Sequence, residues 1–129
     1  MDADDQAILA RLDRLGALLF ARDPAIVDEL WSDLGFRLIG SEPGEIADTR
    51  ESLAALMRGL FSRKARLSWS WDNRKVTCQG EIAWVFAEGH VVVTAPDRTD
   101  RLPYRLVCIF QRVAGDWRWR LFSGSQPAS

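Results

Sequence analysis

The sequence is poor in the residues that most often bind metal ions. Its 129 residues include one histidine and two cysteines, and Cys78 and Cys108 form no Cys-X-X-Cys motif. A zinc site built from cysteine and histidine is therefore not expected. We interpret both cysteines as reduced core residues of a cytoplasmic protein, and we predict no metal and no cofactor.

The sequence also lacks an excess of charge of either sign and any long apolar run. It has 17 basic and 18 acidic side chains, a formal net charge of −1. This balance gives no electrostatic signature of a nucleic-acid or anionic-membrane partner. No apolar run approaches the ~20 residues that span a bilayer. The acidic residues 1–5 do not resemble a signal peptide. We therefore expect neither a nucleic-acid nor a membrane partner.

Aromatic residues, by contrast, are plentiful but uneven in kind. There are six tryptophans and six phenylalanines, but only one tyrosine. Tryptophan is large and seldom fully buried, so six of them require a large core, a pocket or an interface. The composition therefore favours a domain with an aromatic-lined pocket.

Helical patterns come first along the chain and strand patterns follow, which predicts an α+β fold. Apolar residues at spacings of three and four predict a helix over 4–21. Asp23 and Pro24 are typical of the N-cap and first position of a second helix, which we expect to end at Gly35. Asp48 and Glu51 resemble a capping box for a third helix, ending near 62–64.

The C-terminal half alternates with the period of two that indicates strands. The expected strands are 36–39, 67–78, 82–94, 102–113 and 117–123. The alternation breaks at 72–74, which predicts a β-bulge and a bend. In the last strand we expect four residues to share one face: Trp117, Trp119, Leu121 and Ser123. Both faces of the long strands carry apolar residues, which predicts a partner on the outer face, most simply a second copy.

Several segments, in this order and spacing, resemble the NTF2-like superfamily and most nearly its SnoaL-like domains. They are the long first helix, Asp23-Pro24, Phe36 to Gly40, the loop with Glu45, Thr49-Arg50-Glu51, Gly80 to Val85, and Phe110 to Trp119. The resemblance implies that residues 1–129 form a single domain. It further implies an α+β cone in which three helices pack on a strongly curved antiparallel sheet and enclose a pocket. It also implies that the protein forms a homodimer through the outer sheet face. It implies no single function, since relatives include isomerases, cyclases, dehydratases, hydrolases and non-catalytic binding or assembly domains.

Two ionisable side chains of the 82–94 strand are the first catalytic candidates. Glu88 and His90 share a face with Trp84 and Phe86, because side chains two apart on a strand point the same way. If this face is concave, an apolar pocket raises the pKa of the carboxyl group toward that of a useful general base. If it faces outward, the pair lies in solvent or at the dimer interface. Alternation alone does not decide between these possibilities.

Asp72 and Tyr104 are two further candidates, although an ordinary structural role is favoured for both. Asp72 lies at the expected bulge, and bulges often redirect side chains near sites. It could equally bond its own backbone. Tyr104 could donate a hydrogen bond to a substrate oxygen, as a tyrosine does in ketosteroid isomerases, or it could be a satisfied core residue.

Six residues are the candidates for ligand contact. They are Trp31, Trp69, Trp71, Phe110, Arg112 and Trp119. Arg112 could bind an anionic group or stack on tryptophan, or it could simply be solvated at a strand end. The few ionisable candidates favour binding of a small hydrophobic molecule in the aromatic-lined pocket. The alternative is a cofactor-independent isomerase, cyclase or dehydratase that uses a pocket carboxylate.

Overall fold

The structure, a computed structural model, describes residues 2–128. Its helices are α1 (Ala3–Ala21), α2 (Ile26–Leu30) and α3 (Arg50–Phe61). Its strands are β1 (Arg37–Ile39), β2 (Ile46–Ala47), β3 (Arg66–Gln79), β4 (Ile82–Thr94), β5 (Thr99–Val113) and β6 (Asp116–Ser125). The predicted α+β class is confirmed, and each expected helix and strand is present; the strand 82–94 has the predicted bounds, whereas the ends of the others are shifted.

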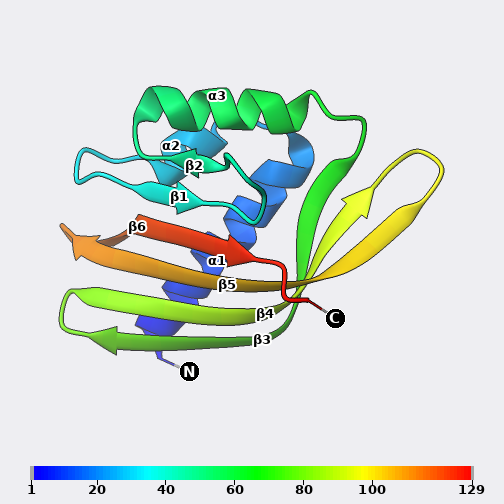
Figure 1. The fold of residues 1–129 in the computed structure, drawn as a ribbon. Coiled ribbons are helices and arrows are strands. Elements are labelled where there is room, and N and C mark those ends of the chain that lie inside the picture. Colours follow the sequence, from blue (N-terminus) through cyan, green and yellow to red (C-terminus); the bar gives the residue numbers. More distant parts are fainter. Residues whose placement is uncertain (1, 129) are drawn as a thin grey trace.

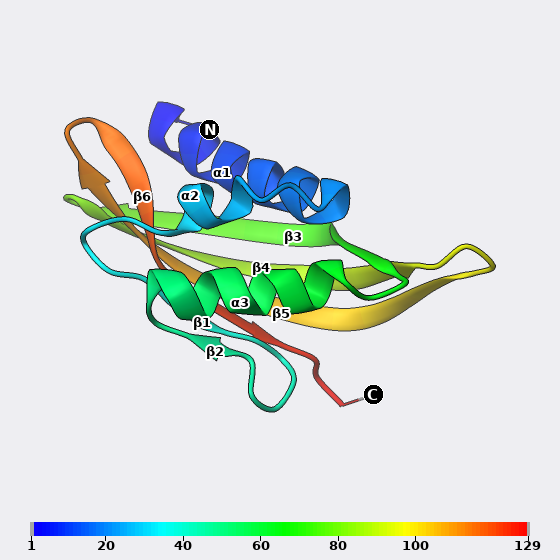
Figure 2. The same ribbon diagram turned by 90° about the horizontal axis from the view of Figure 1, so that it is seen from above.

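One continuous sheet has the strand order β2-β1-β6-β5-β4-β3. Neighbouring strands are antiparallel except β1 and β6, which run parallel. The helices lie on one side of the long strands, with α1 against β3 and α3 above the short strands (Figure 1; Figure 2). The predicted apolar stripe of α1 is buried between this helix and the sheet. It consists of Ile8, Leu9, Leu12, Leu15, Leu18 and Leu19.

The long strands bend sharply near their middle (Figure 1). The pairing of β3 with β4 skips Asp72, which confirms the predicted bulge. Beside the bulge, a Cβ atom on Gly89 would lie 2.0 Å from the carbonyl oxygen of Ser70. Only glycine permits this approach of the two backbones. The bend carries the ends of β3, β4 and β5 toward the helices and leaves a hollow between the layers.

Exposure along β4 shows which of its faces meets the helices. Ala83, Val85 and Ala87 are completely buried, whereas Trp84 and Phe86 are 40% and 41% exposed. The small odd-numbered residues therefore face the core, and the aromatic face of β4 is the outer one. This answers the question that the alternating pattern left open.

Helix α2 is shorter than predicted at both ends. The carboxylate of Asp23 accepts a hydrogen bond of 2.9 Å from the N–H of Ala25, within the turn that precedes the helix. Trp31 has extended backbone angles and stops the helix, so the expected continuation to Gly35 is wrong.

The cap of α3 lies one residue later than predicted. Thr49 is the N-cap, and its side chain and that of Ser52 form the capping box. The assignment to Asp48 and Glu51 was therefore wrong, although it found the start of the helix.

An irregularity between β5 and β6 changes the face predicted for the last strand. The pairing skips Arg120, so the alternation reverses there. Phe122 and Gly124, not Leu121 and Ser123, are the buried residues after the bulge. The cysteine prediction also needs a correction, because Cys108 is buried but Cys78 is exposed.

Candidate functional site

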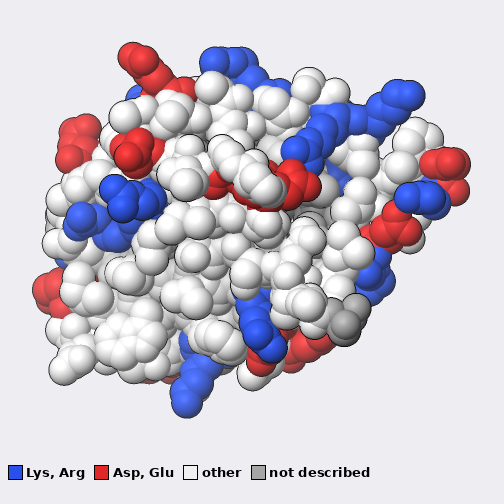
Figure 3. Space-filling view, viewed as in Figure 1, with Lys and Arg blue, Asp and Glu red and all other residues white. Residues whose placement is uncertain are grey.

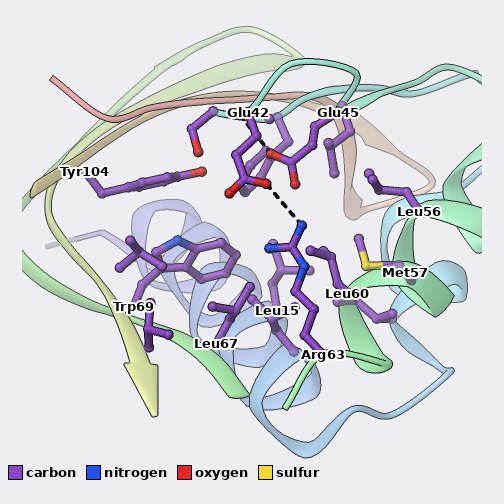
Figure 4. Close-up of a pocket in the computed structure, with 18 of the residues that line it drawn as sticks. Leu15, Glu42, Glu45, Leu56, Met57, Leu60, Arg63, Leu67, Trp69 and Tyr104 are labelled. Carbon is purple, nitrogen blue, oxygen red and sulfur yellow. Dashed lines mark hydrogen bonds and ion pairs between the residues drawn. The ribbon is translucent and has the colours of Figure 1, made fainter. Parts of the chain in front are cut away.

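A cavity of about 260 Å³ lies between the helices and the curved ends of β3, β4 and β5. This is close to the lower end of small-molecule sites, roughly 300–1,000 Å³. Aliphatic side chains form most of the wall, among them Leu15, Leu19, Leu56, Met57, Leu60, Leu67, Val91, Val93 and Leu102. The few polar groups gather at one side (Figure 4). The pocket expected between helices and sheet is therefore present.

Trp69 brings a hydrogen-bond donor to the cavity wall. Its ring stacks on Trp71, with centroids 5.9 Å apart, and packs against Phe122 at 5.6 Å. Its Nε1 atom is buried and makes no hydrogen bond of standard geometry among residues 2–128, although its N–H lies close enough to the Tyr104 oxygen to oppose part of the rise in the pKa of Tyr104. Unpartnered buried donors are rare because desolvation is costly, so this N–H is a candidate to bind a ligand.

Tyr104 supplies a second donor from the neighbouring strand β5. The residue is 5% exposed, and its hydroxyl group points toward the polar side of the cavity (Figure 4). Gly124 makes room for it, since a Cβ atom there would lie 1.7 Å from the Tyr104 oxygen. Burial, and secondarily the negative charge of Glu45, raises the pKa of Tyr104 well above its usual range. The hydroxyl therefore keeps its proton and remains a donor at neutral pH.

The loop between β1 and β2 holds a carboxylate at the same cavity. The N–H of Glu42 donates a hydrogen bond of 2.9 Å to the Glu45 carboxylate. Gly40 lets this side chain fold over the loop, because a Cβ atom on Gly40 would lie 2.6 Å from it. The Glu42 carboxylate pairs instead with Arg63, just after α3, at 3.0 Å. Glu45 has no cationic partner among the residues that the structure describes.

This arrangement combines an apolar cavity with two donors and one free acceptor. Tyr104 and Trp69 can donate to a ligand oxygen, and Glu45 can accept a hydrogen bond or a proton. Within residues 2–128 no group of three His, Cys, Asp or Glu side chains is placed to hold a metal ion. None of the described helices is long and apolar enough to cross a membrane.

Residues 8–129 match the sequence model of a family described as SnoaL-like domain. The chain belongs to this family. No curated protein matches this SnoaL-like domain in sequence.

Solved structures share the fold of this SnoaL-like domain at low sequence identity. A provisionally named dehydratase of the NTF2-like family from Streptomyces avermitilis has a TM-score of 0.83 and 12% identity, with 99% of each chain covered. A provisionally named scytalone dehydratase from Novosphingobium aromaticivorans has a TM-score of 0.81 and 13% identity, covering 97% of this chain and 85% of that one. A provisionally named calcium/calmodulin-dependent protein kinase II association domain from Xanthomonas campestris has a TM-score of 0.81 and 16% identity. The match covers 99% of this chain and 91% of that one. At these identities the similarity establishes the NTF2-like fold and nothing about activity.

The first catalytic candidates of this SnoaL-like domain lie outside the cavity. Glu88 is on the outer face of β4, where its carboxylate accepts a hydrogen bond of 3.3 Å from Arg105. The Nδ1 atom of His90 lies 3.6 Å from the carboxylate of Asp72, whose side chain is 66% exposed. Of the two arrangements that the alternation left open for Glu88 and His90, the structure has the outward one, and Asp72 does not line the cavity either. The reason is that the opposite face of β4 turns inward.

Of the predicted site residues, Trp69 and Tyr104 line the cavity. Trp71 lines a second, more open hollow between α1 and β3, and Trp31 packs against the core away from the cavity.

The other predicted contacts serve the core and the rim. Phe110 is fully buried against Trp119, with ring centroids 4.4 Å apart. The indole N–H of Trp119 donates a hydrogen bond of 2.8 Å to Glu29. Arg112 pairs with Glu81 and Asp4 at the opposite end of the sheet. None of the three contacts the cavity, because the strand end that carries them is closed by α1 and α2.

Three charged residues of the site were not predicted from the sequence: Glu42, Glu45 and Arg63. Glu45 was noted only as part of a loop that resembles the family. The available signal was an acidic pair beside Gly40 and Gly44 in the clearest loop of the chain. Loops often carry functional residues, but sequence gives no indication of which way their side chains point.

Proposed function

We propose that this protein binds a small hydrophobic molecule in the cavity beside Trp69 and Tyr104. The observation that carries the proposal is the buried Nε1 atom of Trp69, which makes no hydrogen bond of standard geometry among the described residues, in a wall that is otherwise largely hydrocarbon. An apolar ligand with one hydrogen-bonding group would fill the space and satisfy this donor. The provisional name of one structural neighbour, an association domain, is in line with a non-catalytic function.

The same substitution at two neighbouring positions of β4 tests this proposal. Val93 lines the cavity, whereas Val92 precedes it on the opposite face of the strand. Val93→Phe should fill the cavity and weaken binding of adamantylmethanol, a compact neutral probe, by at least about tenfold. Val92→Phe should leave the affinity unchanged. Isothermal titration calorimetry measures both. Unaltered affinity of Val93→Phe, with circular dichroism showing the native fold, would contradict binding at this cavity.

Proton transfer next to a carbonyl group is the second candidate function. It is favoured by one observation: a carboxylate and a tyrosine hydroxyl, those of Glu45 and Tyr104, face the same cavity. Glu45 would take a proton from the carbon beside the carbonyl group. Tyr104 would donate a hydrogen bond to the oxygen that becomes negative, and Glu45 would then return the proton. The provisional dehydratase names of two structural neighbours are in line with an enzyme.

Isotope exchange separates this activity from binding alone. The protein should catalyse deuterium incorporation into β-tetralone in deuterium oxide, as followed by nuclear magnetic resonance. Glu45→Gln should slow this exchange by roughly a hundredfold or more. Glu51→Gln on the exposed surface of α3 is the matched control. Exchange no faster than in buffer would eliminate this candidate and leave the binding proposal intact.

A further inference from the structure

We infer that the ligand of this cavity is a protonated amine with an apolar body, for which Glu45 is the counter-ion. The inference rests on the proposed binding function and names the chemical class of its ligand. It gives Glu45 the role of a charge partner instead of a proton acceptor.

The charges along the cavity do not cancel. Three of the described lining residues carry a formal charge at neutral pH: Glu42, Glu45 and Arg63. Arg63 pairs with Glu42 at 3.0 Å, which leaves the carboxylate of Glu45 uncompensated. A carboxylate beside an apolar wall is stabilised most by a cation that reaches it within hydrogen-bond distance.

The position of Glu45 makes it accessible to a ligand in the cavity. Its carboxylate is fixed from the loop side by the N–H of Glu42, and Gly40 gives it the space to lie there. Figure 4 shows it directed toward the cavity beside the carboxylate of Glu42, which lies between it and the hydroxyl group of Tyr104. Its negative charge also acts on Tyr104, since it contributes to raising the pKa of that hydroxyl group.

Aromatic rings that line the same cavity as this carboxylate suit a cation. The rings of Trp69 and Tyr104 have centroids 6.1 Å apart, and that of Phe122 lies 5.6 Å from Trp69. Aromatic rings attract ammonium groups through their quadrupole, and this attraction grows when the cation is removed from water. An anion would meet the opposite conditions, because Glu45 repels it and Arg63 is already paired. The cavity should therefore discriminate by charge among ligands of one shape.

Three probes with the same hydrocarbon body test this discrimination. Adamantylmethylamine is positive at neutral pH, adamantylmethanol is neutral and adamantanecarboxylic acid is negative. A charge-assisted hydrogen bond should make the amine bind at least about tenfold more tightly than the alcohol, and the acid should bind most weakly. Raising the salt concentration should narrow this difference, because the cavity is partly open to solvent.

Glu45→Gln, with Glu51→Gln as the matched control, tests whether the Glu45 carboxylate is the group that produces the preference for the amine. Glu45→Gln should abolish the preference for the amine over the alcohol, whereas Glu51→Gln should behave as the wild type. Equal binding of amine and alcohol, tighter binding of the acid, or a preference that survives Glu45→Gln would overturn the inference while the proposed function stands. If the wild type binds none of the three probes, the proposed function itself fails.

Discussion

Tyr104 and Glu29 are both buried polar side chains, but only one of them is fully paired. Glu29 is 8% exposed and is bonded by Arg11, Arg14 and Trp119. Tyr104 is 5% exposed and directs its hydroxyl group into the cavity. Buried polar groups with every partner in place stabilise a fold, and those that lack partners more often serve a ligand. We therefore assign Glu29 to stability and Tyr104 to the site.

The ionisation of Tyr104 can be measured without interference, because it is the only tyrosine. Burial raises its pKa, so the folded state retains the proton beyond the ordinary pKa of about 10. Its contribution to stability is present below that pH and is lost as the pH rises toward the folded-state pKa. An alkaline absorbance titration should show tyrosinate only above the ordinary range or together with unfolding. A midpoint near that of free tyrosine in protein that circular dichroism shows to be folded would contradict the burial.

Removal of Glu29 should destabilise the protein strongly. Its side chain is 2% exposed, and Glu29→Ala leaves Arg11 and the buried Trp119 indole without this acceptor. We expect a loss of about 3 kcal/mol in the free energy of unfolding. Asp13→Ala removes a carboxylate that is 64% exposed and paired with Arg74, and it should cost less than about 1 kcal/mol. Urea denaturation measures both, and equal small losses would contradict the structural role of Glu29.

At the scale of secondary-structure elements, the bend of β3 and β4 decides where the cavity lies. The bulge at Asp72 was predictable, because broken alternation at a polar turn-like segment is a local signal. The importance of Gly89 was not predictable, since it depends on the approach of Ser70 from another strand. The capping box of α3 was likewise not predictable to the residue. Two overlapping candidates, Asp48 with Glu51 and Thr49 with Ser52, differ by one position, and the sequence does not choose between them.

Gly89→Ala and Gly59→Ala should have opposite effects on stability. A Cβ atom on Gly89 meets backbone atoms of β3, so alanine there should cost about 1–3 kcal/mol. Gly59 lies within α3 and has open space around it, so alanine should stabilise by about 0.5–1 kcal/mol. Thermal unfolding followed by circular dichroism compares the two. A stable Gly89→Ala variant would show that the bend does not require this glycine.

At the scale of the whole molecule, the outer sheet face is the largest feature that the cavity does not explain. Figure 3 shows an extended area of this face without Lys, Arg, Asp or Glu. Ile82, Trp84, Phe86 and Val107 are each about two-fifths exposed there. A monomer seldom exposes contiguous apolar area of this kind, so the face favours a partner.

We propose that a second copy of the chain covers this face. Light scattering coupled to size-exclusion chromatography should give the mass of a dimer at tens of micromolar protein. Trp84→Glu should convert the dimer to a folded monomer, because it places a charge in the apolar interface. Ile46→Glu, at a residue that is 63% exposed on β2, should leave the dimer intact. A wild-type monomer at this concentration would contradict the proposal.

The sequence by itself determined the order of the elements, the stripe of α1, the bulge of β3 and the family. These features depend on periodicity and local steric preference, which neighbouring residues set among themselves. Only the tertiary structure decided that Glu88 and His90 lie outside and that Glu45, Arg63 and Tyr104 line one cavity. The direction of the bend selects the inner face of β4, and the site joins residues from a loop, a helix end and β5. No local pattern carries that information, because contacts between distant segments form only when the sheet curves around the helices.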